Sequence, residues 1–206
     1  METEESKKES ALPVLSIWMR PGQTVAALVA DGKGHVGALA IATCFSILNC
    51  RRWLVLEGGD GFALNWKALP GVLLGSVAVG LVLLYLYSWL FRNFGRWMGG
   101  TGSLRGIRTG MGWGILPVTV LLACVFFIPS TVWINVAEAP DGTLTQTFNG
   151  WGFLLFAAFL YSYGVFLLSL ASAHGLSALR AFATLAITFL VSIIPLSILV
   201  QSILPG

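Results

Sequence analysis

The chain has 206 residues, of which 56% are hydrophobic and only 10% are charged, and its net charge is +3. A soluble domain usually carries charge on about a quarter of its residues, so this composition excludes a water-exposed globule. The basic residues are scattered, which gives no indication of a nucleic-acid partner. We therefore expect an all-α protein, a polytopic transmembrane helix bundle.

Two segments precede the first long apolar run. Residues 1–11 are polar and mix acidic side chains with lysines, which predicts a disordered tail. Residues 12–34 are too polar and too interrupted to cross a bilayer. Pro21 suits the first turn of a helix there, and we expect a cytoplasmic interfacial helix. The alternative is a helix that packs on the bundle.

Residues 35–206 form the expected membrane domain of five spans. Four uninterrupted apolar runs, free of acidic and basic residues, predict spans at 69–91, 111–134, 151–173 and 181–204. The remaining span, 35–56, includes Arg51 and Arg52, which must reach the headgroup region. Its alternative is a re-entrant or interfacial helix.

The basic residues set the expected orientation. With five spans, Arg51, Arg52 and Lys67 fall on one side of the membrane, and the other nine of the twelve basic residues fall on the opposite side. Cytoplasmic segments carry the excess of Lys and Arg. The N-terminus is therefore expected in the cytoplasm and the C-terminus outside.

Glycines between the second and third spans suggest close helix packing. Gly102, Gly106, Gly110 and Gly114 recur every four residues, which aligns them along one face of a helix and lets a neighbour approach. In the preceding span, Gly71 and Gly75 form a second such pair. Just before the third span, Ser103 can cap a helix by accepting a bond from a backbone N–H.

Three arginines flank the same glycine-rich turn, namely Arg96, Arg105 and Arg108. The turn lacks the GK[ST] ending and the preceding strand of a P-loop, which excludes that nucleotide site. Contact with lipid headgroups is one reading of these arginines. Positive-inside charge alone is the other.

Prolines lie inside three of the expected spans, at Pro117, Pro129 and Pro195. Each removes a backbone hydrogen bond and is expected to kink its helix. The kinks are either hinges beside a cavity or static bends fixed by packing.

No constellation of catalytic residues is present. The two histidines, His35 and His174, fall at expected membrane borders, and the sequence contains neither GxSxG nor HExxH. No carboxylate lies in the middle of a span, where proton- or ion-coupled transporters place one. We therefore expect no catalytic residue, no cofactor and no metal site.

The order of these features resembles the Yip1 domain family of polytopic membrane proteins. The resemblance rests on Trp18, Pro21 and Thr24, on the Gly-Arg-Trp-x-Gly-Gly-x-Gly-Ser segment from Gly95 to Ser103, and on Arg108 and Pro117. It implies five spans, a cytoplasmic N-terminus and no known catalytic activity. The compact prokaryotic-type members are the most similar.

The expected function is that of a non-catalytic membrane protein that organises lipids or partner proteins. Its expected partners are membrane lipids and a membrane protein or a second copy of the chain, in a bacterial inner membrane. The main alternative is a passive or facilitated transporter of a small solute. An enzyme acting on lipid headgroups is the third hypothesis, although no paired acid and base supports it.

Overall fold

The computed structural model describes residues 13–49, 55–58, 61–64, 67, 69–127, 134–138 and 144–203. Helices dominate, and two short antiparallel hairpins accompany them. The elements in chain order are α2 (Pro13–Met19), α3 (Pro21–Ala30), α4 (Gly34–Asn49), β1 (Val55–Gly58), β2 (Gly61–Leu64), α6 (Leu69–Trp97), α7 (Leu104–Gly114), α8 (Leu116–Phe127), β3 (Ile134–Glu138), β4 (Leu144–Phe148), α9 (Gly150–His174) and α10 (Ala178–Ile203).

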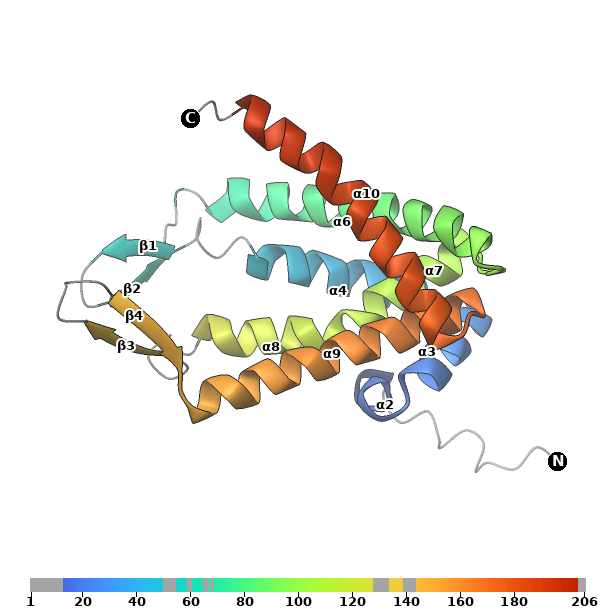
Figure 1. Cartoon of the computed structure of the whole chain (residues 1–206), viewed down its shortest axis with the longest axis horizontal. Helices are drawn as coiled ribbons and strands as arrows, with labels where there is room; N and C mark the ends of the chain where they lie inside the picture. The colour runs from blue at the N-terminus through green and yellow to red at the C-terminus, as the bar shows by residue number, and fades with distance from the viewer. Residues whose placement is uncertain are drawn as a thin grey trace.

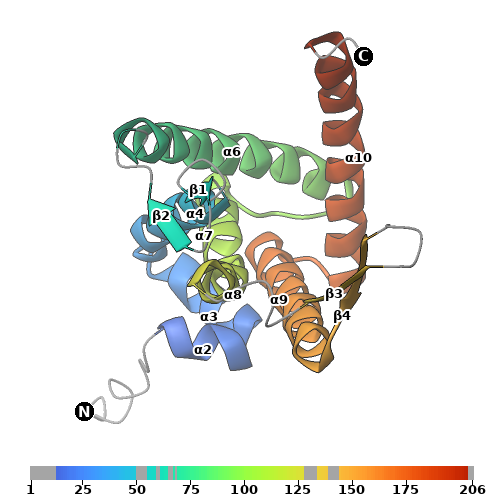
Figure 2. The same ribbon diagram turned by 90° about the vertical axis from the view of Figure 1, so that its left-hand side faces the viewer.

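The long helices lie along the long axis of the molecule (Figure 1). Both hairpins gather at one end, whereas α2, α3 and the α6–α7 and α9–α10 connections gather at the other. Figure 2 shows α10 leaving the bundle, so that its C-terminal half stands away from the other helices. Helix α10 packs on α6 and α9.

Three described segments are long and apolar enough to cross a membrane, namely Leu69–Trp97, Leu104–Val125 and Gly150–His174. Two of them begin within one residue of the predicted spans 69–91 and 151–173. The prediction of a helical membrane protein is therefore confirmed. The two short hairpins that accompany the helices were not anticipated.

The first predicted span differs from the structure at its end. Helix α4 stops at Asn49, and Val55 and Leu56, expected to finish the span, lie in β1. In this hairpin Val55 pairs with Leu64, and Gly58 pairs with Gly61. The apolar stretch beyond the arginines is thus extended backbone and not a continuation of the helix.

The third predicted span, 111–134, also differs. Its helix begins earlier, at Leu104, and is interrupted at Ile115 before continuing as α8 to Phe127. Pro117 follows this break and has no N–H to donate to the carbonyl of Trp113. Ile134, expected to end the span, is the first residue of β3.

The other two prolines have different surroundings. Pro129 lies outside the described residues. Helix α10 continues through Pro195 to Ile203, so this proline does not end its helix. The bounds of α10 therefore show no break at Pro195, and the bend expected there stays a prediction.

Helix α7 lies between two hydrophobic cores. On one side the buried residues come from α4, α6, α7, α9 and α10, and they are Ala42, Leu84, Phe91, Ile107, Met111, Leu170 and Leu185. On the other side they come from α2, α3, α4, α7 and α9, and they are Ile17, Val25, Ala38, Trp113, Val165 and Ala173. A short helix thus joins most elements of the fold.

Helices α2 and α3 pack on the bundle, which is the alternative considered for residues 12–34. Ile17 and Val25 are fully buried. The opposite side of α2 stays apolar and open, because Leu15 is 64% exposed and Met19 is 87% exposed. The segment therefore has one buried face and one exposed apolar face.

Candidate functional site

The glycine-rich turn between α6 and α7 encloses a histidine. The positive φ of +89° at Gly99 is a conformation that favours glycine. Immediately after the turn, Ser103 accepts a 3.0 Å hydrogen bond from the Gly106 N–H, which confirms the predicted helix cap. The turn is held to α9 by a 3.0 Å bond from the Thr101 N–H to the His174 carbonyl.

His174 lies beneath this turn and is only 1% exposed. A Cβ added to Gly95 would lie 2.7 Å from His174 Nδ1, and one added to Gly100 would lie 3.0 Å from the same atom. Neither ring nitrogen has a hydrogen-bond partner among the described residues. The glycines of the turn therefore make room for a buried imidazole, a relation that the sequence did not indicate.

Three of the four regularly spaced glycines face α9. A Cβ on Gly110 would lie 2.6 Å from the Cβ of Ala173 and 3.0 Å from the carbonyl oxygen of Ser169. Gly102 and Gly114 also lie close against α9, whereas Gly106 faces Val29 of α3. Because backbone atoms are among these neighbours, larger side chains cannot be accommodated by rotamer changes alone.

The opposite face of α7 packs just as closely on α4. Gly112 meets the backbone and side chain of Ala38, and a Cβ on Gly37 would lie 2.6 Å from the Trp113 ring. The indole N–H of Trp113 donates to the Gly34 carbonyl at 2.8 Å. These glycines lie outside the four-residue period, so the sequence pattern missed them.

The second predicted glycine pair does not pack within the described part of the chain. No atom of the described residues lies within 4 Å of a Cβ added to Gly71 or Gly75. In the same helix it is Gly80 that approaches α4, because a Cβ there would lie 2.9 Å from the Cβ of Ser46. The small-residue spacing alone does not tell which face of a helix has a neighbour.

The N-terminal residues Trp18, Pro21 and Thr24 lie where α2 and α3 pack against α9. The Trp18 ring stacks on Tyr161, with centroids 6.4 Å apart and planes 13° from parallel, and the Tyr161 hydroxyl donates to the Trp18 carbonyl. Thr24 is buried and donates to the Arg20 carbonyl at 2.9 Å. Pro21 begins α3, as predicted.

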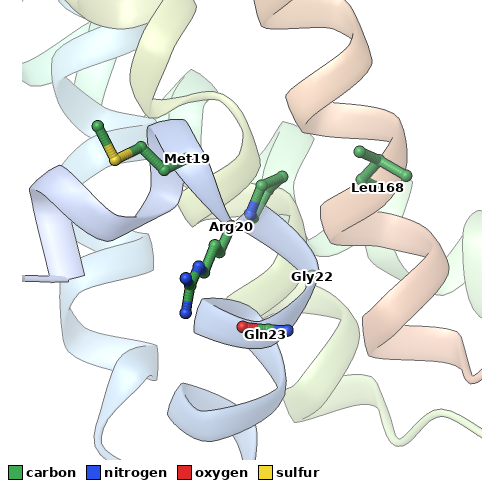
Figure 3. Close-up of a pocket in the computed structure, with 6 residues that line it drawn as sticks. Met19, Arg20, Gly22, Gln23 and Leu168 are labelled. Atoms are coloured by element: carbon green, nitrogen blue, oxygen red, sulfur yellow. The ribbon is translucent and has the colours of Figure 1, made fainter. Parts of the chain in front are cut away.

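A shallow hollow of about 320 Å³ opens at the α2–α3 corner. Figure 3 shows Leu168 of α9 across from Met19, Arg20 and Gln23. Beside it, the Ser172 hydroxyl donates to the Gly22 carbonyl at 2.7 Å. The hollow is thus a seam between the N-terminal helices and α9.

The three predicted headgroup arginines have different surroundings. Arg105 donates to the Gly32 carbonyl at 2.9 Å, and the guanidinium carbon of Arg108 lies 4.4 Å from the centroid of the Tyr85 ring. Arg96 is exposed, and no hydrogen bond or ion pair from it occurs among the described residues. The structure therefore separates Arg96 from the other two.

The chain matches a known protein family. The family model described as Yip1 domain matches residues 15–199, which is most of the chain. No curated protein and no solved structure gives a significant match.

Proposed function

Because the chain belongs to the Yip1 domain family, we propose that it is a non-catalytic, five-span membrane protein that organises lipids or partner proteins. In this proposal the N-terminus and the α6–α7 turn face the cytoplasm and the C-terminus lies outside. A bacterial inner membrane is the proposed location. Membrane lipids and a membrane protein or second copy are the proposed partners.

The course of the chain supports five crossings. In Figure 1, α4, α6, α7 with α8, α9 and α10 run alternately between the two ends of the bundle. Helix α10 has 26 residues, enough for a span, whereas the 16 residues of α4 reach only about 24 Å. We propose that α4 crosses together with the residues that follow it.

The positions of the charges support the orientation. Arg96, Arg105, Arg108 and Arg180 all lie at or beside the two helix connections of the α2–α3 end. An excess of arginine marks the cytoplasmic side of a membrane protein. The hairpin end is therefore proposed to face outward.

The hydrogen bonds of hydroxyl groups in the spans carry the non-catalytic proposal. Seven of these side chains donate to the carbonyl four residues earlier in their own helix or just before it, whereas Ser76 and Ser169 have no partner among the described residues. The seven are Ser88, Thr109, Thr119, Ser162, Thr184, Thr188 and Ser192. A hydroxyl bound this way donates its hydrogen to the backbone of its own helix, so it cannot donate the same hydrogen to a solute. This favours organisation over the transport hypothesis.

Cysteine labelling tests the orientation. Thr101 in the turn and Thr147 in β4 are both exposed. In a background without Cys44, Cys50 and Cys124, Thr147→Cys should react with a membrane-impermeant maleimide added to intact cells. Thr101→Cys should react only after the cells are opened. The reverse pattern would overturn the proposed topology.

Crosslinking mass spectrometry in native membranes tests the organising role. The proposal expects reproducible crosslinks to a second copy or to a particular membrane protein. Proteoliposomes should show no more solute uptake than empty vesicles. Saturable uptake together with an absence of neighbours would replace the proposed function by the transport alternative.

A further inference from the structure

Basic side chains of α4, α6 and α7 include two buried nitrogens without a hydrogen-bond partner among the described residues, Arg92 Nε and His35 Nδ1. Arg108 of α7 donates its Nε–H to the Leu104 carbonyl at 3.1 Å, so its terminal nitrogens can bind another acceptor. Its guanidinium lies against the face of Tyr85, a position that holds the charged plane in place. Tyr85 itself is 48% exposed, so this pair lies at the surface of the bundle.

Arg92 lies on the same side of α6. It follows Tyr85 by seven residues and Ser88 by four, spacings that bring all three to one helix face. That face meets α7, because the Ser88 hydroxyl lies 3.4 Å from the sulfur of Met111. The Nε of Arg92 is buried and has no partner among the described residues.

His35 of α4 adds a third polar group. Its Nδ1 is buried without a partner in the described part of the chain. The preceding residue, Gly34, lies against α7, because a Cβ added there would be 2.7 Å from the Cγ2 of Thr109. No carboxylate among the described residues forms an ion pair with Arg92 or Arg108. The buried Nε–H of Arg92 has no acceptor among the described residues, which is costly, so an anion from outside the chain would complete this cluster.

The surroundings select the kind of anion. Leu86 and Trp89 of α6 are about half exposed, and together with Tyr85 they give this part of α6 the mixture of apolar and aromatic side chains found where lipid meets water. Guanidinium groups match phosphate oxygens in pairs. An anion that reaches the cluster from the membrane carries acyl chains, which the apolar surface of α6 can contact.

We infer that Arg92 and Arg108, with His35 beside them, bind the phosphate of an anionic lipid headgroup. This rests on the proposed membrane orientation, because it requires the cluster to lie at headgroup depth. It also assigns the organising role to a particular lipid contact. Arg96 follows Arg92 by one helical turn, but its side chain is exposed, whereas Arg92 is partly buried.

Native mass spectrometry of the full-length protein in detergent tests the assignment. Phosphatidylglycerol should be retained more strongly than phosphatidylcholine. Arg108→Gln and Arg92→Gln should each weaken phosphatidylglycerol binding about tenfold, as expected for the loss of a hydrogen bond to a charged group. Arg96→Gln removes the same charge from the same helix as Arg92 and should change binding less than about twofold, as for an exposed charge.

Several results would overturn the assignment. Equal retention of the two lipids, or equal effects of all three substitutions, would leave only a general attraction to charge. Displacement of the lipid by inorganic phosphate would identify a site for free phosphate instead. If Arg108→Gln does not fold, Arg108→Lys serves in its place, since lysine keeps the charge but loses the paired geometry.

The lipid measurement is independent of the topology measurement. External labelling of Thr101→Cys would overturn the proposed orientation, whatever lipid is retained. Unchanged retention in the Arg92 and Arg108 variants, with labelling as expected, would overturn the lipid site alone.

Discussion

At one end of the bundle, the α6–α7 turn and helices α2 and α3 pack against the C-terminal part of α9, whereas at the other end the chain reverses through two hairpins (Figure 1). The first end is joined by contacts between distant segments, such as Trp113 with Gly34 and Tyr161 with Trp18. The hairpins are paired locally, as Ile134 is with Phe148. Substitutions at the end that holds the α6–α7 turn (the turn end) should therefore lower the free energy of unfolding much more than substitutions at the hairpin end.

The largest effect is expected from Gly110→Leu. Its side chain would collide with Ala173 and with the backbone of Ser169, so we expect a loss of about 3 kcal/mol in the free energy of unfolding. Gly106→Leu should also destabilise through Val29. Thermal unfolding in detergent measures both.

Two control substitutions belong with this prediction. Gly75→Leu places the same side chain in open space and should change stability by less than about 0.5 kcal/mol. Thr109→Ala keeps the glycine face and should cost less than Gly110→Leu. Equal stability of all these variants would contradict the role of the α7 glycines.

A smaller effect is expected at Gly95. Gly95→Ala brings a methyl group against the His174 ring and should cost about 2 kcal/mol. His174→Ala removes the obstacle, so the double variant should be more stable than the sum of the single effects predicts. Additive effects in this double-mutant cycle would show that the methyl group and the imidazole do not compete for space.

The smallest effect is expected at the edge of the turn end. Tyr161→Phe keeps the stacking on Trp18 but loses one hydrogen bond, which should cost about 1 kcal/mol. Thr147→Ala at the hairpin end should have almost no effect, because this residue is exposed. A greater loss at Thr147 than at Tyr161 would reverse the comparison between the two ends.

Hydropathy predicted the helices that meet lipid better than the helix buried in protein. Helices α6 and α9 begin close to their predicted positions because their apolar runs are long. The first turns of α7 fell outside the predicted span 111–134, since a glycine-rich helix enclosed by protein has no need of an apolar run, and only the capping residue Ser103 indicated where the helix begins. The hairpins had a local signal in Gly59-Asp60 and Asp141-Gly142, dipeptides that are typical of turns.

The site was only partly predictable, because a spacing does not identify a neighbour. Gly110 and Gly75 belong to the same kind of pattern, yet only Gly110 has a helix of the described chain against it. The burial of His174 depends on Gly95, which is distant in the sequence. Similarly, the sequence grouped the arginines by their position near a turn. That Arg108 contacts the Tyr85 ring, whereas Arg96 is exposed, became clear only from the three-dimensional fold.

The enclosure of α7 has a consequence for biogenesis. Leu104–Gly114 carries two arginines and four glycines, which makes it a poor segment for entry into lipid on its own. Its packing surface on α9 does not exist until Gly150–His174 has been synthesised. During translation, only α3 and α4 are available to cover this helix. We therefore expect it to reach its final packed position only after α9 has been synthesised.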